Sequence, residues 1–440
     1  MPVSPTAIDR RLLNAASDSA ELTRNLSVLC DEIGPRFAGT AGYRQAAAFM
    51  LERFRACRLD QVHLESFPFT AWRRGEPATL AMRKPLNRDY GCYALCYSAA
   101  TPEKGLTARM VDIGSGSEDE IAAKRRRIKG RIVLTTGSAG HRTGIYSRCV
   151  ELGAAGFVLG SSMPGMLLQT GTVANGKGGD IPAVNIALES LLQIRRFAAV
   201  PGANPQLHLR VDATLEPDVT WNVIGELHGT AFPDELVLIG GHLDSHEIGP
   251  GAFDNGAGAL MVMEVARLLA TQRRYLKRTV RFIGFAGEEI GLLGSHYHAK
   301  VHAAELQNAR FMLNCDTPAL GKPHGLGFHE CPKGEAYLAG LSEAMKEPLL
   351  YQNRHHCHSD HYPFILQRVP TAGVGGGPQE PPVQHFYHMA ADTADKVRVE
   401  DLQAKAAFVA RILMRIANDD NWPLAPRSKA QVARWKREGR

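Results

Sequence analysis

The chain has 440 residues, of which 44% are hydrophobic and 22% are charged, and its formal net charge is +6 at pH 7. This composition is ordinary for a folded globular protein and excludes a long disordered chain. The length exceeds one ordinary hydrophobic core, so we expect two domains or one domain with a large insertion.

The basic residues gather at positions 124–131 and in the C-terminal tail. We interpret both runs as solvated surfaces and predict no nucleic-acid partner. No run of eighteen apolar residues occurs, and the first ten residues lack an apolar core, so we predict no membrane span and, by default, a cytoplasmic location. A secreted protein whose signal had been removed would look the same. The eight cysteines are dispersed, which favours reduced thiols.

Helices are predicted near the start of the chain, over residues 17–58, where leucines recur at helical spacing. Residues 61–69 alternate between polar and apolar side chains and predict a strand. From about Tyr97 to Glu216, short strand-like segments separated by glycine-rich turns are typical of a self-contained α+β unit. We therefore predict a discontinuous domain of residues 1–96 and 217–440, interrupted by an insertion of residues 97–216.

In the second half of the chain, apolar strand-like runs alternate with helical ones. This order predicts an α/β fold with a mostly parallel sheet sandwiched between helices. The expected strands are residues 235–240, 279–285, 310–315 and 371–374, and the expected helices are residues 257–269, 291–300, 335–345 and 401–416. In such sheets ligands bind beyond the carboxyl ends of the strands.

The first candidate metal-binding residues follow the end of the first of these strands. His242 and Asp244 alternate with Leu243, so in extended backbone their side chains leave on the same face. This pattern is a metal-binding histidine whose other ring nitrogen is held by Asp244, or else a buried ion pair. Asp254 follows a Gly/Pro loop and precedes the next predicted helix, which strengthens the metal interpretation.

Further acids and histidines follow the other predicted strands, as a dinuclear metal site requires. Two divalent ions about 3.5–4 Å apart need a bridging carboxylate and two further ligands each. We assign His242 and Asp316 to one ion, Glu289 and His388 to the other, and Asp254 to the bridge. Histidine and carboxylate donors without thiolates favour zinc, although manganese or cobalt would fit the same donors.

Glu288 remains uncoordinated beside a predicted ligand, so it could act as the general base that moves a proton from water to the leaving amine. We expect Tyr387, Asp360 and His361 to contact the substrate. The run His-His-Cys-His at residues 355–358 offers a rival metal site. Adjacent histidines on a strand point to opposite faces, so at most two of these could share an ion.

As a set, these motifs resemble the co-catalytic dizinc exopeptidase family of bacterial secreted aminopeptidases and the plasma glutamate carboxypeptidase. The resemblance extends from about Leu26 to Ile416 and implies the same metal ligands, with Glu288 as the general base. Family members commonly have a cis peptide after the bridging aspartate, here between Asp254 and Asn255. The resemblance rests on residues 33–36, 242–245, 251–258, 287–291, 314–316 and 387–388.

The insertion resembles a protease-associated domain, on residues 129–134, 153–156 and 181–184. It contributes no predicted ligand, so we expect it to shape access to the site and to restrict the pocket to short substrates. Residues 62–65 and 74–76 resemble the carboxypeptidase branch of the family.

The leading hypothesis is a metal-dependent exopeptidase that acts on short peptides as an aminopeptidase or dipeptidase. A carboxypeptidase is the alternative, and it would need a fixed cation for the substrate carboxylate, for which Arg354 and Arg368 are candidates. A non-catalytic receptor-like homologue is disfavoured by the complete ligand set. A glutaminyl cyclase-like acyltransferase is disfavoured by the insertion and by the pair Tyr387 and His388. The sequence is compatible with a homodimer.

Overall fold

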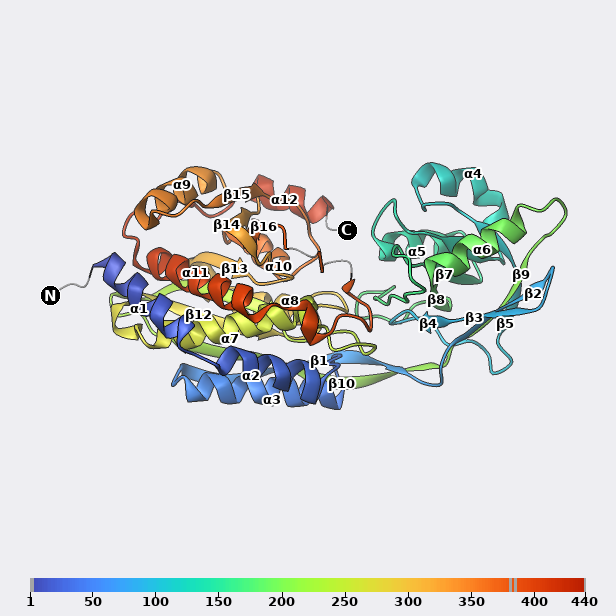
Figure 1. Ribbon diagram of the computed structural model, residues 1–440. Helices are drawn as coiled ribbons and strands as arrows, with labels where there is room; N and C mark the ends of the chain where they lie inside the picture. The colour runs from blue at the N-terminus through green and yellow to red at the C-terminus, as the bar shows by residue number, and fades with distance from the viewer. Residues whose placement is uncertain (1–3, 380–381, 384–385, 439–440) are drawn as a thin grey trace.

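The computed structural model describes residues 4–379, 382–383 and 386–438 and has two lobes of unequal size (Figure 1). Each lobe contains one eight-stranded sheet. Two long strands, β1 (Asp60–Arg74) and β10 (Ala213–Leu227), pair antiparallel and run from the larger lobe toward the smaller one. They therefore lead the chain out of the larger lobe and back into it.

The larger lobe is a mixed α/β structure. Its other strands are β11 (Phe232–His242), β12 (Arg278–Phe285), β13 (Ala309–Asn314), β14 (Gly321–Phe328), β15 (Leu350–Asn353) and β16 (Thr371–Gly377). Its helices are α1 (Pro5–Ser17), α2 (Glu21–Ser27), α3 (Ala41–Ala56), α7 (Ala257–Ala270), α8 (Leu293–Val301), α9 (Gly334–Met345), α10 (His361–Leu366), α11 (Val399–Asn418) and α12 (Lys429–Glu438). Shorter helical segments are η1 (Val28–Ile33), η2 (Ala252–Gly256), η3 (Arg273–Tyr275), η4 (Glu305–Asn308) and η6 (Ala394–Lys396).

The larger sheet has the strand order β1-β10-β12-β11-β13-β16-β14-β15. The four strands at its centre, β12, β11, β13 and β16, are parallel, whereas β10 and β14 run antiparallel to their central neighbours. The predicted mostly parallel sheet therefore describes the centre, and the whole sheet is mixed. All four central strands lie where the sequence predicted strands.

Side chains of the central strand β11 alternate between two hydrophobic cores. Val237 and Ile239 belong to the core that α7 and α11 cover. Leu236 and Leu238 point the other way and pack with Phe285 near α8 and α10. Each fully buried side chain of this size stabilises the fold by roughly 1.5–3 kcal/mol. Apolar residues on both faces fix the register of β11, so its carboxyl end is held at a defined position.

The smaller lobe contains the second sheet, with strand order β3-β2-β9-β5-β6-β7-β8-β4. The strands β2, β3 and β4 precede residue 97, so this sheet begins before the predicted start of the insertion. The division into two domains and the protease-associated character of the insertion stay predictions. The strands are β2 (Thr79–Lys84), β3 (Arg88–Tyr90), β4 (Cys92–Ala94), β5 (Leu106–Asp112), β6 (Ile132–Thr135), β7 (Gly156–Gly160), β8 (Ala183–Ile186) and β9 (Gln206–Arg210), and the helices are α4 (Glu118–Ile128), α5 (Arg142–Glu151) and α6 (Leu188–Ala198).

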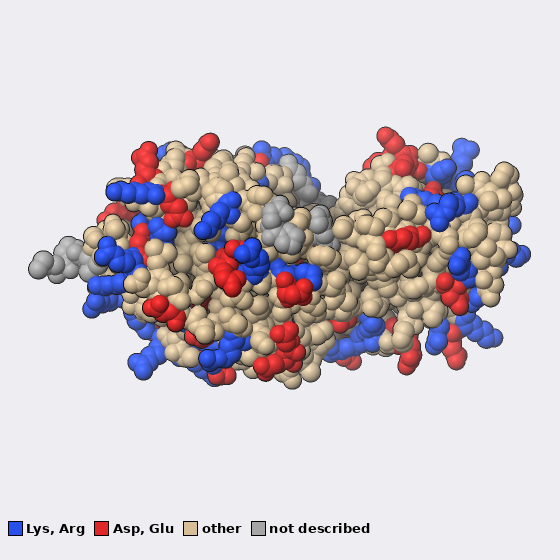
Figure 2. Space-filling model, viewed as in Figure 1, with Lys and Arg blue, Asp and Glu red and all other residues tan. Residues whose placement is uncertain are grey.

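Charged side chains are scattered over both lobes on the face that Figure 2 shows, and the surface is notched between the lobes. In the part of the chain that the structure describes, no helix combines the length and the apolar character needed to cross a membrane.

Candidate active site

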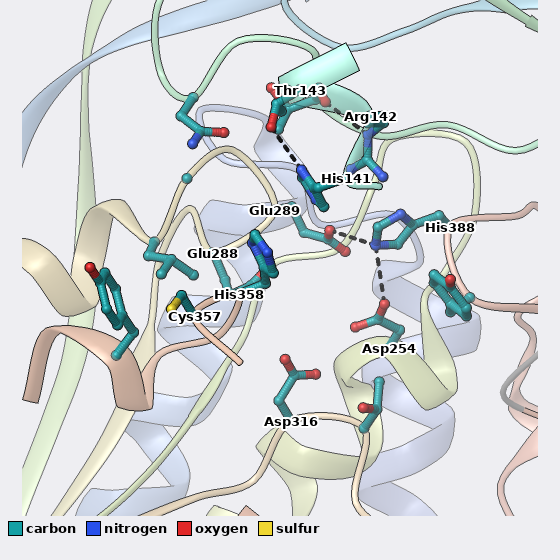
Figure 3. Close-up of a pocket in the computed structure, with 18 of the residues that line it drawn as sticks. His141, Arg142, Thr143, Asp254, Glu288, Glu289, Asp316, Cys357, His358 and His388 are labelled. Carbon is teal, nitrogen blue, oxygen red and sulfur yellow. Dashed lines mark hydrogen bonds and ion pairs between the residues drawn. The ribbon is translucent and has the colours of Figure 1, made fainter. Parts of the chain in front are cut away.

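A cavity of about 690 Å³ lies at the carboxyl ends of the central strands and is lined by both lobes (Figure 3). The larger lobe contributes Asp254, Glu288, Glu289, Asp316 and His388 to its wall. The smaller lobe contributes residues around the start of α5. The sheet therefore brings together the acids that sequence analysis expected at strand ends.

His242, the last residue of β11, is fully buried. Its Nδ1 donates a hydrogen bond to the backbone carbonyl of Asp244 at 3.0 Å. That bond leaves Nε2 facing the site, 3.3 Å from Oδ1 of Asp254 and 3.4 Å from Oδ1 of Asp316. These three side chains form a first ligand cluster, which matches one predicted ion site.

A second cluster contains His388 and Glu289. Nε2 of His388 lies 3.0 Å from Oε2 of Glu289 and 3.3 Å from Oδ2 of Asp254 (Figure 3). Asp254 thus has one carboxylate oxygen in each cluster. This is the arrangement that a bridging carboxylate requires.

The backbone around Asp254 is held by other side chains. Asp392 accepts hydrogen bonds from the amides of Phe253 at 2.8 Å and Asp254 at 2.9 Å. The Asp254–Asn255 peptide is cis, as the family resemblance implied. The Asn255 side chain donates to the carbonyl of Cys315 at 2.7 Å, which ties the Asp254 loop to the end of β13.

Asp244 holds the turn that carries the two glutamates. Its carboxylate oxygens each accept a backbone amide at 3.2 Å, one from Glu288 and one from Glu289. Its Oδ1 is 3.7 Å from Nδ1 of His242. The expected hydrogen bond from His242 to the Asp244 side chain is therefore replaced by one to the Asp244 carbonyl, and the carboxylate positions the glutamates instead.

Glu288 lines the cavity, and a carboxylate oxygen of it lies within 4.8 Å of ligand-type atoms of His242 and Asp316. Burial raises the pKa of Glu288 well above its ordinary value, and the carboxylates of Asp316 and Glu289 act in the same direction while His242 opposes them. A carboxyl group in such surroundings is suited to holding a proton during a reaction.

The donor set fits divalent metal ions. Nε2 of His242 and Oε1 of Glu289 are buried and have no hydrogen-bond partner among the described residues. Four carboxylates, of Asp254, Glu288, Glu289 and Asp316, line one cavity. Such crowding of buried like charges is costly unless cations accompany it. Imidazole nitrogens and carboxylate oxygens without a thiolate suit zinc, manganese or cobalt.

His246 is a neighbour of the second cluster that sequence analysis missed. Its Nε2 lies 2.9 Å from Oε2 of Glu289, and its ring packs edge-on against that of His388 at 4.5 Å. Its Nδ1 lies 3.5 Å from Sγ of Cys96. The available signal was a histidine at the next alternate position after His242 and Asp244, in a loop whose course the sequence does not reveal.

The three residues expected to contact substrate differ in position. Tyr387 is 42% exposed and lines the cavity. Asp360 and His361 are fully buried and are absent from the cavity wall, so the expectation of direct contact is wrong for both. They lie at the start of the short helix α10, where the His361 ring stacks on that of His329 at 3.7 Å and is held beneath the surface.

The rival site at residues 355–358 is also rearranged. Ligand-type atoms of His356 group with those of His329 and His361. His358 instead stacks on His141 of the smaller lobe, with ring centroids 4.4 Å apart at the cavity wall. The sequence neighbours therefore point to different places, as alternation along an extended segment requires.

Arg142 is the second residue that sequence analysis missed. It opens α5, and its side chain lines the cavity near His388 (Figure 3). Its Nε donates a hydrogen bond to the carbonyl of Thr172 at 2.8 Å. The arginines named from the sequence, Arg354 and Arg368, do not line the cavity.

Part of the chain is similar to known peptidases. Residues 222–413 match peptidase family M28, and this segment contains all five predicted metal ligands and Glu288. This segment is therefore similar to the M28 peptidases. The chain is 26% identical over 421 residues to human carboxypeptidase Q, covering 92% of this chain and 86% of that protein.

Two solved structures share the fold. A peptidase M28 precursor from Shewanella amazonensis SB2B has a TM-score of 0.81 and 25% identity, covering 96% of this chain and 100% of that chain. BSAP, a zinc aminopeptidase from Bacillus subtilis, has a TM-score of 0.71 and 24% identity, covering 89% and 93%. The resemblance to a metallo-exopeptidase family is confirmed, and the M28 relatives support a metallo-exopeptidase.

Proposed function

We propose that this M28 relative is a two-metal exopeptidase that removes the N-terminal residue of short peptides, dipeptides included. The observation that carries the proposal is the position of Asp254, whose two carboxylate oxygens each lie 3.3 Å from a different histidine, His242 and His388. A single carboxylate shared by two ligand clusters is what two adjacent divalent ions require.

One ion would be held by His242, Asp254 and Asp316, and the other by Asp254, Glu289 and His388. Zinc is the metal we expect, because the donor set suits it and because BSAP, of similar fold, is a zinc aminopeptidase. Bound there, the ions would polarise the scissile carbonyl and lower the pKa of water.

The chain's own residues would supply positioning and proton transfer. Glu288 takes a proton from the attacking water and delivers it to the leaving amine. Asp244 keeps Glu288 and Glu289 in place through the amide hydrogen bonds described above. Tyr387, which precedes His388 and lines the cavity, would offer a ring and a hydroxyl to the bound peptide.

The charge of the cavity supports action at the N-terminus. Carboxylates of Glu288 and Glu289 line it, and a free α-ammonium group would be attracted to them. The residues of the smaller lobe that close one side of the cavity support the expected restriction to short substrates.

A carboxypeptidase remains the second candidate, because human carboxypeptidase Q aligns with 92% of this chain. The deciding experiment compares hydrolysis of Ala-Leu, N-acetyl-Ala-Leu and Ala-Leu-amide by the zinc-loaded protein. The proposal predicts that acetylation of the amine abolishes cleavage. Unchanged cleavage of the acetylated peptide together with loss of cleavage of the amide would show that the protein is a carboxypeptidase.

A further inference from the structure

We propose that Arg142 forms a binding subsite for the α-carboxylate of the substrate, so that dipeptides with a free C-terminus are the preferred substrates. The inference rests on the proposed exopeptidase function and adds a residue of the smaller lobe to it.

Arg142 is fixed on one side and free on the other. Its Nε donates to the Thr172 carbonyl at 2.8 Å. Its guanidinium lies against Gly171, where an added Cβ would come within 2.0 Å of Cζ. Gly171, with φ +147°, therefore leaves the space that the guanidinium occupies.

The two terminal nitrogens of Arg142 have no partner in the described part of the chain, where no carboxylate lies within 4.0 Å of the guanidinium and no other hydrogen bond from it is found. Glu289 and Glu288 attract the guanidinium only at longer range, without direct pairing. A partly buried cation whose terminal nitrogens bind no carboxylate is poorly compensated, and a ligand carboxylate would improve that compensation. The fork of an arginine matches a carboxylate with two parallel hydrogen bonds.

Other arginines near the site are already engaged. Arg36 is fully buried, and its guanidinium donates to backbone carbonyls, including those of Leu243 at 2.9 Å and Gly251 at 3.0 Å. Arg74 pairs with Glu247. Arg142 is therefore the arginine of the cavity wall that is available to a ligand.

The cavity wall carries charges of both signs, as recognition of a zwitterionic peptide requires. Acids of the larger lobe and Arg142 of the smaller lobe line the same cavity. A dipeptide spans roughly 7 Å when extended, so its α-ammonium and α-carboxylate groups can both bind within one cavity. A longer peptide has an uncharged amide where the dipeptide has its carboxylate, and would leave Arg142 unpaired.

The competing explanation is that Arg142 only holds the segment of Thr172 near His388. That segment does contact the second ligand cluster, because the amide of Thr170 donates to the His388 carbonyl at 2.9 Å. A purely structural role would affect every substrate equally, whereas a carboxylate subsite affects only substrates that carry the carboxylate.

The test measures kcat and KM of the zinc-loaded protein for Ala-Leu and Ala-Leu-amide, in the wild type and in Arg142→Met, Arg142→Lys and the control Arg148→Met. Arg148 lies on the same helix and faces solvent with Glu151. We expect the wild type to prefer Ala-Leu over the amide at least tenfold. Arg142→Met should lose about 10²- to 10³-fold in kcat/KM for Ala-Leu, mainly through KM, and less than about threefold for the amide.

Arg142→Lys should recover part of the loss, because it keeps the charge but not the fork, and Arg148→Met should resemble the wild type. An equal loss for both substrates, or a wild type without preference for the free carboxylate, would overturn the subsite. If neither substrate is cleaved, the proposed function fails, and calorimetric binding of L-leucine and L-leucinamide decides the subsite separately. Loss of leucine binding alone in Arg142→Met supports it, and equal binding by the wild type and the variant overturns it.

Discussion

The amide of Thr170 in the smaller lobe donates a hydrogen bond to the carbonyl of His388, a predicted metal ligand of the larger lobe, at 2.9 Å. An isolated bridge between Gln169 and Met389 continues this contact. The smaller lobe therefore contacts one predicted metal ligand, His388, and through Arg142 it lines the cavity where a substrate would lie. Its role in the site can be tested without deleting it.

Gly171→Ala should impair recognition of the substrate carboxylate while leaving both metals bound. The new Cβ would overlap the Arg142 guanidinium, and φ +147° is unfavourable for alanine. We expect the preference for Ala-Leu over its amide to fall about tenfold or more. Gly140→Ala is the control, since an added Cβ there meets no atom within 4 Å. If the variant had normal metal content and kept its preference for Ala-Leu over the amide, the proposed role of the Arg142 position would be wrong.

Glu288→Gln should abolish turnover and keep the metals. The amide preserves the shape of the side chain but cannot carry the proton, so kcat should fall about 10²- to 10⁴-fold or more. Metal content measured in parallel should equal that of the wild type. Glu335→Gln, at an exposed position of α9, controls for loss of a negative charge. Near-normal turnover by Glu288→Gln would show that Glu288 is not the general base.

Asp254→Asn should lose bound metal, because its two oxygens each face one cluster and the substitution removes the charge they share. We expect less than the wild-type metal content after dialysis against buffer, together with loss of activity. Asp234→Asn, an exposed substitution near the start of β11, should bind metal normally. Two ions at full occupancy in Asp254→Asn would count against the bridge.

A titrating cluster remote from the proposed metal ligands gives a pH prediction. Hydrogen bonds from His302 to Glu65 at 2.6 Å and to Glu305 at 3.0 Å raise the pKa of His302. A raised histidine pKa stabilises the fold fully below about pH 6.5, and this stabilisation is lost as the pH rises through the folded-state value. His302→Gln should therefore lower the free energy of unfolding by about 1–2 kcal/mol at pH 6 and by less at pH 9.

Thermal or urea unfolding of the zinc-loaded wild type and His302→Gln at both pH values checks this. His63→Gln is the control, because His63 lies on the same strand as Glu65 but is exposed. A difference between wild type and His302→Gln that grew with pH would show that the imidazolium is not what stabilises this cluster.

That the proposed metal ligands lie close together could be predicted from sequence, because strand ends converge. Apolar runs marked β11, β12 and β13, and the polar residues that follow parallel strands must meet at one edge of the sheet. His242, Glu289 and Asp316 are therefore brought together by sheet topology alone. The strands β14 and β15 were missed, since three glycines in β14 leave no alternating pattern to recognise.

The residues that escaped prediction depend on loop paths and on the arrangement of the lobes. His246 reaches Glu289 only because the loop after β11 turns back over the site. Arg142 precedes β11 by about ninety positions and reaches the cavity because the smaller lobe packs over the strand ends. Asp360 and His361 were misplaced because a histidine next to an acid has the same appearance in sequence whether it faces the cavity or the core.

The most direct test of the two-metal proposal is a metal titration of the chelator-treated protein with Ala-Leu hydrolysis and bound zinc measured on the same samples. We predict no hydrolysis without metal, binding of two zinc ions per chain, and full activity only when both are bound. Two bound ions without any peptide hydrolysis, or full activity at one ion per chain, would contradict it.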